Sequence, residues 1–273
     1  MYQLKLMEAY YKNNYQNPFV YSAGILYIHS AKNISIAPKE LHLYDTGFQF
    51  EFDKELELLV FGNDKLFNNG VIVINEPGTI DADYRGNVMI AFYNTSNKTY
   101  NIERLDLVAI LRFGLVVRDW RKADKGMDKL EDKVLYYKAE KNFEPHQGSE
   151  LSSGLDLKAQ IKKKLIVPSG QSATIPTGVK VRIPKNTEVH VRARSGFSTK
   201  NKVLVFHEII TPSNGFVDVE VKLLNLNSED LVIEPGTRIA QMVAVKSVNI
   251  ELYETNDLSQ TARGDAGFGS TGT

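Results

Sequence analysis

The residues best suited to chemistry lie together in one short stretch, residues 78–86, which reads GTIDADYRG. The stretch places two acids, Asp81 and Asp83, and one aromatic residue, Tyr84, between two glycines. The segments on both sides are rich in β-branched and large apolar residues, so they are predicted as strands. The acidic stretch is then the tip of a hairpin. An isolated pair of acids at such a tip is most often a solvated turn, because Asp and Gly are the commonest turn residues.

The complete string is more specific than an isolated pair of acids. It closely resembles the third signature motif of the trimeric-type dUTPases, the enzymes that hydrolyse deoxyuridine triphosphate. Segments later in the chain resemble the other four motifs of that family. Motifs one, two, four and five correspond to residues 154–157 (GLDL), 194–197 (RSGF), 236–241 (GTRIAQ) and 263–272 (RGDAGFGSTG).

The second half of the chain repeats the first half. Identical residues recur at a separation of 130 residues (154 − 24) and, after one inserted residue, of 131 residues (188 − 57). The matched pairs include Gly24/Gly154, Pro38/Pro168, Glu57/Glu188, Val88/Val219 and Ala109/Ala240. The second register runs without a gap from Glu57 to Ala109, which indicates a duplicated domain.

The two copies differ where the motifs lie. The second copy keeps motifs one, two and four, whereas the first copy has lost their functional residues. The replaced pairs are Asp156/Leu26, Arg194/Asn63, Ser195/Asp64, Arg238/Leu107 and Gln241/Ile110. The third motif is reversed, because Asp81 faces Pro212 and Tyr84 faces Gly215. Together the copies hold one complete set, an arrangement that resembles the monomeric, duplicated dUTPases of herpesviruses.

Alternating and β-branched segments with closely spaced turns favour an all-β sandwich or barrel. The resemblance implies two dUTPase-like copies, each a barrel or jelly-roll-like unit. We expect the first copy over residues 1–118, with motif three, and the second over residues 151–252, with motifs one, two and four. Residues 119–150 are dense in mixed charge and are expected to form a linker, in part helical, across a domain surface. Residues 253–273 are expected to form a flexible C-terminal arm that carries motif five.

Composition excludes several other classes of protein. Lys and Arg together number 33, as do Asp and Glu, so no overall basic charge draws the chain to nucleic acid or to an anionic membrane. The absence of cysteine excludes disulfides and zinc–thiolate sites. The N-terminus lacks a signal-peptide core, and no apolar run approaches the ~20 residues that a membrane span needs. We therefore expect a soluble, intracellular protein of the cytoplasm or nucleus, in a host cell if the chain is viral.

The resemblance implies roles for the hairpin residues. Asp81 would hold and deprotonate the attacking water and would contact the sugar 3′-hydroxyl, because a carboxylate accepts hydrogen bonds from both. Tyr84 would pack its ring on the deoxyribose, where a 2′-hydroxyl would collide. The uracil slot would be formed by the backbone of Gly78, Thr79 and Ile80 together with the side chain of Asn75.

By the same resemblance, the motifs of the second copy would handle the triphosphate. Asp156 would hold Mg²⁺ through water, since Mg²⁺ keeps several of its waters, and the apolar neighbours of Asp156 make an unpaired charge there costly. Ser195, the backbone of Gly196, and Gln241 would donate hydrogen bonds to the phosphates. Arg194 would orient the site through an acid.

The C-terminal arm would close over the substrate. Phe268 would stack on the uracil ring, and Arg263 would meet the phosphate charge. Ser270, Thr271 and the amides of glycines such as Gly269 would cradle the β- and γ-phosphates. A tail rich in Gly, Ser and Thr is otherwise more often disordered.

These implications define a monomeric enzyme, a dUTP diphosphatase that forms dUMP and pyrophosphate with Mg²⁺ as its cofactor. It would keep uracil out of DNA and supply dUMP, with dUTP as its partner and with no nucleic acid or membrane. A dCTP deaminase shares the fold but needs an extra acid at the base edge, and the intact third motif argues against it. The other alternative is a protein kept mainly for binding host partners, which should show eroded motifs.

Overall fold

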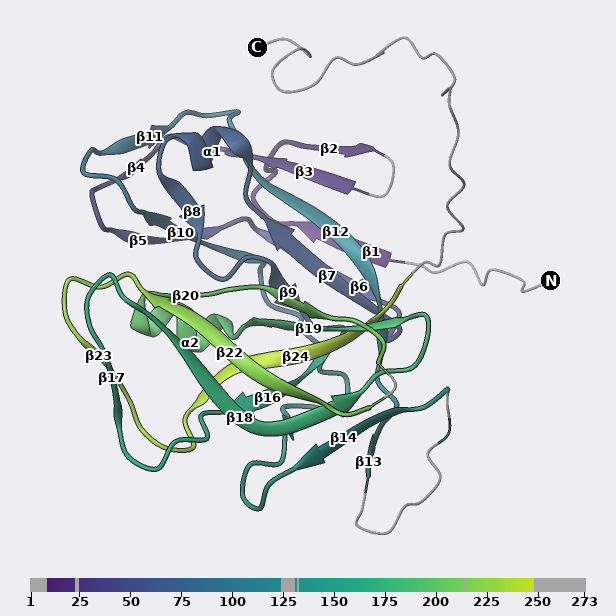
Figure 1. Cartoon of the computed structure of the whole chain (residues 1–273). Helices are drawn as coiled ribbons and strands as arrows, with labels where there is room; N and C mark the ends of the chain where they lie inside the picture. Colours follow the sequence, from purple (N-terminus) through teal and green to yellow (C-terminus); the bar gives the residue numbers. More distant parts are fainter. Residues whose placement is uncertain (1–8, 23–24, 124–130, 132, 214, 248–273) are drawn as a thin grey trace, which may run out of the picture.

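The computed structural model describes residues 9–22, 25–123, 131, 133–213 and 215–247. Over these residues the chain is mainly β-strand, with two short helices, α1 (Asp64–Asn68) and α2 (Ser195–Asn201). Two similar β units, one from each half of the chain, pack against each other, with the purple-to-blue unit above the green-to-yellow unit in Figure 1. The predicted all-β architecture of two similar copies is confirmed.

The first unit is built from strands of the first half of the chain. They are β1 (Ala9–Asn13), β2 (Phe19–Ser22), β3 (Ile25–His29), β4 (Ile34–Ile36), β5 (Leu41–Asp45), β6 (Phe48–Phe52), β7 (Leu56–Phe61), β8 (Val71–Val73), β9 (Gly78–Ile80), β10 (Met89–Asn94), β11 (Tyr100–Ile102) and β12 (Leu107–Val117).

A middle segment and the second unit supply the other strands. The middle segment contains β13 (Trp120–Lys122), β14 (Leu135–Ala139) and β15 (His146–Gln147). The second unit contains β16 (Gly154–Lys158), β17 (Leu165–Val167), β18 (Ser172–Arg182), β19 (Thr187–Ala193), β20 (Val203–Val205), β21 (Glu208–Ile210), β22 (Val217–Asn225), β23 (Leu231–Ile233) and β24 (Arg238–Lys246).

Alternation of side chains explains why these segments become strands with one buried face. In β22, Val219, Val221 and Leu223 are buried, whereas the intervening Glu220 and Lys222 are exposed. A period of two is the repeat of a strand, so it places every second residue in the core. The same pattern recurs in both halves, and each unit has its own apolar core.

One sheet joins the two units. β12 is 11 residues long, which is enough to pair with β3 and β7 in its own unit and still reach the other unit. Its last residues pair with β24, with Val116 opposite Val245 and Val117 opposite Ala244. The sheet runs in the order β15-β16-β24-β12-β3-β2, with β7 and β19 also attached to it. The first and second units are therefore held together by backbone hydrogen bonds as well as by side chains.

The predicted duplication is visible in the strand pairing. Asn63 and Arg194, which are 131 residues apart (194 − 63), stand at the N-caps of α1 and α2. The pairing of Leu41 with Tyr93 in the first unit recurs as the pairing of Ser172 with Leu224 in the second. Helices and central strands thus keep one register.

Motif one does not keep the predicted register. On β12, Ile110 pairs with Tyr27, and the corresponding Gln241 on β24 pairs with Asp156. The counterpart of Asp156 is therefore Tyr27, and the expected Leu26 is wrong. By the same pairing Ile25, and not Gly24, corresponds to Gly154. The loop that follows this strand differs in length between the copies, so counting back from later residues misplaces the strand.

Two further correspondences shift for the same reason. Equivalent turn hydrogen bonds join Glu40 N to Ala37 O and Gln171 N to Pro168 O, so Pro168 corresponds to Ala37 and not to Pro38.

In the second of these shifts, Ile80 pairs with Leu58, as Ile210 pairs with Val189. Asp81 therefore corresponds to Thr211 and not to Pro212. The second copy still lacks the acid, so the complementary loss stands.

The segment predicted as a linker differs from expectation. Its described part contains strands and no helix. β14 pairs with β18 as β1 pairs with β6, and β15 pairs with β16 as β2 pairs with β3. The repeated unit thus reaches back into residues 135–147. Dense charge around these strands hides their alternation in the sequence.

No helix within the part of the chain that the structure describes is both long enough and apolar enough to cross a membrane.

Candidate active site

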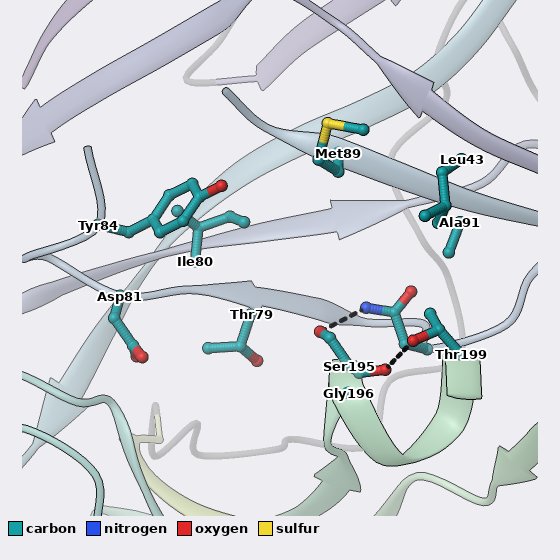
Figure 2. A pocket seen from close by; sticks show the side chains of 11 residues that line it. Leu43, Thr79, Ile80, Asp81, Tyr84, Met89, Ala91, Ser195, Gly196 and Thr199 are labelled. Carbon is teal, nitrogen blue, oxygen red and sulfur yellow. Dashed lines mark hydrogen bonds between the residues drawn. The ribbon is translucent and has the colours of Figure 1, made fainter. Parts of the chain in front are cut away.

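A cavity of about 310 Å³ lies where the hairpin of the first unit meets the start of α2 in the second unit. Figure 2 shows Thr79 and Asp81 along one side of this cavity and Ser195 and Thr199 on the helix opposite. Its lining comprises Leu43, Asn75, Thr79, Ile80, Asp81, Tyr84, Met89, Ala91, Ser195, Gly196 and Thr199. The cavity therefore needs both copies, and it combines residues of motifs two and three.

A hydrogen bond between two side chains closes one end of the cavity. Asn75 Nδ2 donates to Ser195 Oγ at 2.9 Å, across 120 residues of sequence. Asn75 is nearly buried, at 9% exposed, and it follows β8. Ser195 begins α2, where its carbonyl accepts a hydrogen bond from Thr199 Oγ1 at 2.6 Å. The two copies are thus joined at the cavity itself.

Strand β9 forms the wall opposite the helix. Among the described strands it pairs only with β7, so backbone groups on its other edge can meet a ligand. A side chain at Gly78 would place Cβ 3.2 Å from Asn75 Nδ2 and 3.3 Å from Val60 Cβ. Glycine therefore lets the strand lie close to both the Asn75 amide and β7.

Asp81 directly follows β9 and is partly buried. Burial raises the pKa of its carboxyl, and the neighbouring Asp83 acts in the same direction. Ser153 opposes this shift, because its backbone N–H donates to Asp81 Oδ1 at 2.6 Å, and Arg118 also lowers the Asp81 pKa. Asp81 is thus a carboxylate of raised proton affinity that is held in place from the second unit.

The turn that holds Asp81 was not singled out from the sequence. In residues 149–153, Ser149 donates to Asp83, and Arg118 donates from Nη2 to the Leu151 carbonyl at 3.1 Å. A serine-rich turn carries no signal of its own for such a role. Only its position directly before motif one could have suggested it.

Tyr84 lies at the mouth of the cavity, and 41% of the residue is exposed. Its hydroxyl donates to the Asn87 carbonyl at 2.9 Å. A Cβ atom at Gly86 would lie 2.5 Å from this hydroxyl, which no ordinary contact allows. The glycine therefore leaves room for the ring, and the ring is turned across the chain that follows it.

Asp156, Arg194 and Gln241 come together beside the cavity but do not line it. Asp156 Oδ1 accepts from Arg194 Nε at 2.6 Å, and Asp156 Oδ2 accepts from Arg238 Nη1 at 3.1 Å. Two arginines thus balance the charge for which the sequence argument named only Mg²⁺. Gln241 Nε2 donates to the Ala193 carbonyl at 3.0 Å. No group of three or more His, Asp or Glu side chains that could hold a metal occurs among the described residues.

The predicted residues of motif five fall outside the part of the chain that the structure describes. They are Arg263, Phe268, Gly269, Ser270 and Thr271.

Comparison with known proteins bears on this arrangement of an all-β fold and a cavity shared by two copies. The family model described as dUTPase matches residues 16–120 and 141–272. The chain therefore belongs to the dUTPase family. The family matches once in each half, in agreement with the duplication.

Curated relatives resemble the second-copy length of chain. Deoxyuridine 5′-triphosphate nucleotidohydrolase of Rickettsia canadensis is 40% identical over 129 residues, which are 47% of this chain and 87% of the relative. The protein of the same name from Chlamydia trachomatis serovar D is 40% identical over 135 residues, 47% of this chain and 90% of the relative. Each relative is about half as long as this chain, as a single copy would be.

Solved structures of similar proteins include the dUTPase of Staphylococcus bacteriophage 80alpha with dUPNHPP. It is 23% identical, it covers 51% of this chain and 99% of its own, and its TM-score is 0.42.

Proposed function

We propose that this chain hydrolyses dUTP to dUMP and pyrophosphate at one active site built from its two copies. The observation that carries the proposal is the cavity in which Asp81 and strand β9 of the first unit face Ser195 and Gly196 of the second unit. Membership of the dUTPase family supports the reaction. The complementary motifs support a single site for each chain.

Strand β9 and Asn75 would recognise the base. The free edge of β9 offers backbone donors and acceptors at fixed positions, and a uracil ring needs both along one side. Asn75 is already oriented by its hydrogen bond to Ser195. A rigid set of donors rejects cytosine, because a donor on the base would then face a donor on the protein.

Asp81 would act as the base that activates water. Its raised pKa makes the carboxylate a better proton acceptor, while the Ser153 N–H keeps it oriented. The water oxygen attacks the α-phosphorus in line with the leaving pyrophosphate. The proton passes to Asp81, and the electron pair of the broken P–O bond leaves with pyrophosphate. Tyr84, at the cavity mouth, would cover the sugar.

Ser195 and the Gly196 backbone would donate to the phosphates from the opposite wall. Gln241 would join them by exchanging its bond to the Ala193 carbonyl for one to the substrate. Arg194 would orient the site through Asp156, the acid that it contacts. Residues 263–272 would close over the bound nucleotide, as in the family motif that they resemble.

Asp156 is the residue that would hold Mg²⁺ through water. A single carboxylate suits an ion that keeps most of its own waters, and Asp156 Oδ2 is paired only with Arg238, whose side chain is 46% exposed and free to turn away. When bound, the ion would neutralise charge on the triphosphate.

A pyrophosphate-release assay with dUTP, dCTP, dTTP and UTP side by side tests the proposal, with Asp81→Asn protein as the control for contaminating hydrolases. We expect release from dUTP far above the other three. Ammonia release from dCTP would instead indicate a deaminase. Release from none of the four would favour a protein that only binds partners.

A further inference from the structure

Ser153 places a buried hydroxyl next to the proposed catalytic base. The residue is 2% exposed, and its backbone N–H donates to Asp81 Oδ1 at 2.6 Å. The Ser153 side chain also lies near enough to lower the pKa of the Asp81 carboxyl. The Ser153 Oγ atom nevertheless meets the geometry of a hydrogen bond with no group among the described residues.

The stability of the fold does not account for this hydroxyl. A buried hydroxyl without a partner lowers stability, because it loses its hydrogen bonds to water and gains none. Alanine would fill almost the same space and would leave the backbone N–H on Asp81 unchanged. In the same turn the Ser152 hydroxyl is used differently, since it accepts a hydrogen bond from Ser149 N at 2.8 Å. Ser153 is therefore the serine whose side chain has no structural partner within this turn.

We propose that the Ser153 hydroxyl is a catalytic group that holds the attacking water together with Asp81. This inference rests on the proposed function. The Ser153 N–H already occupies Asp81 Oδ1, which leaves Oδ2 to accept one hydrogen of the water. Ser153 Oγ would accept the other hydrogen, so a lone pair of the water oxygen would point at the α-phosphorus.

The proton balance is complete without another reactant. One water proton moves to Asp81 as the oxygen bonds to phosphorus, and pyrophosphate leaves with the electron pair of the broken P–O bond. Ser153 keeps its own proton throughout. Its contribution is to orient the water, which matters because attack on phosphorus requires an in-line approach.

Ser153→Ala tests the proposal through turnover, KM, the pH profile of kcat/KM and the melting temperature. We expect kcat for dUTP to fall by roughly tenfold, less than the ~10²-fold typical for loss of a general base, with KM for dUTP unchanged. The acid limb of the profile should move to higher pH, because the Ser153 side chain no longer lowers the pKa of Asp81. Asp83 and Arg118, the charged groups that also act on Asp81, stay in place. The melting temperature should stay the same or rise.

Ser198→Ala is the matched control. Ser198 is also fully buried, and its hydroxyl also lacks a hydrogen bond among the described residues, but it lies on α2 and does not contact Asp81. We expect its turnover and its pH profile to match those of the unsubstituted chain.

Wild-type turnover and an unmoved acid limb in Ser153→Ala would overturn the proposal. A lower kcat together with a lower melting temperature and an unmoved acid limb would also overturn it, since that result indicates lost packing. Failure of the proposed function appears separately, as an unsubstituted chain that releases no pyrophosphate from dUTP.

Discussion

At the scale of single residues, Asp81 shows how a turn residue becomes a candidate base. Its carboxylate is partly buried, so the charged form loses hydration and its pKa rises. A neighbouring backbone N–H then fixes one oxygen. The second oxygen accepts no hydrogen bond that the structure records among the described residues, so it is available to a water molecule.

Replacing Asp81 with asparagine should remove the base and keep the fold. The new Oδ1 can still accept from Ser153 N–H, whereas the amide cannot take a proton from water. We expect kcat to fall at least ~10²-fold with dUTP still bound, as measured by pyrophosphate release and equilibrium binding. Asp83→Asn is the matched control, because Asp83 is an exposed acid two residues away that lies outside the cavity lining. Near-normal turnover of Asp81→Asn would remove this residue from the mechanism.

Gly86→Ala should disturb sugar recognition without touching the substrate. The added Cβ would lie 2.5 Å from Tyr84 Oη and 2.7 Å from Tyr84 Cζ, so the ring must move. We expect the preference for dUTP over UTP, measured as the ratio of kcat/KM values, to fall by roughly tenfold. Gly215→Ala is the control, since no atom lies within 4 Å of its Cβ position. An unchanged preference would show that the position of the Tyr84 ring does not select the sugar.

At the scale of elements, β7 and β19 are joined across the two units by a buried ion pair. Arg192 Nη1 donates to Glu57 Oε2 at 2.8 Å, and the two side chains are 2% and 1% exposed. The same Arg192 nitrogen lies 3.5 Å from Thr79 Oγ1 on β9. The pair thus supports the strand that lines the cavity.

Arg192→Met should leave Glu57 buried without its counter-charge. We expect a loss of about 3–5 kcal/mol in the free energy of unfolding, measured by chemical denaturation. The double variant Glu57→Leu/Arg192→Met should recover most of that loss, because neither charge then remains buried. Equal losses in the single and the double variant would show that shape, and not charge, dominates at this contact.

The turn between β20 and β21 carries a histidine that should make stability depend on pH. Burial, His190 and Arg192 together lower the pKa of His207 to about 4. The unfolded chain, with an ordinary pKa near ~6.5, then binds more protons between these values. Stability is therefore fully present above about pH 6.5 and is lost as the pH falls toward 4.

Denaturation curves at several pH values test this dependence. His207→Gln should show a smaller loss of stability across the same interval, and the difference should be modest because the His207 side chain is exposed. Parallel pH dependence in the two proteins would contradict the assignment.

At the scale of the whole molecule, one chain carries both halves of the cavity, so it should act alone. We expect light scattering to give the mass of a single chain, and activity to be proportional to concentration. Mixing Asp81→Asn chains with Asp156→Asn chains should restore no activity, because each site has one lesion. A stable trimer, or rescue on mixing, would show that the site is shared between chains.

The sequence alone determined the all-β class, the duplication and the complementary set of motifs. Strand period and turn residues are local properties, so GTIDADYRG could be placed on a hairpin tip. The residues of motifs two and three were also named correctly as neighbours of one cavity, since Asn75, Thr79, Asp81, Ser195 and Gly196 all line it. That success depended on reading which motif each copy had lost.

Only the tertiary structure decided which distant groups meet these residues. Ser153 reaches Asp81 across 72 residues, and Arg192 reaches Glu57 across 135. The partner of Asp156 in the other copy, Tyr27, also came from strand pairing and not from counting. Such contacts depend on loop lengths and on how two units share one sheet. No local pattern encodes that geometry, because it arises from packing between segments that are far apart in the chain.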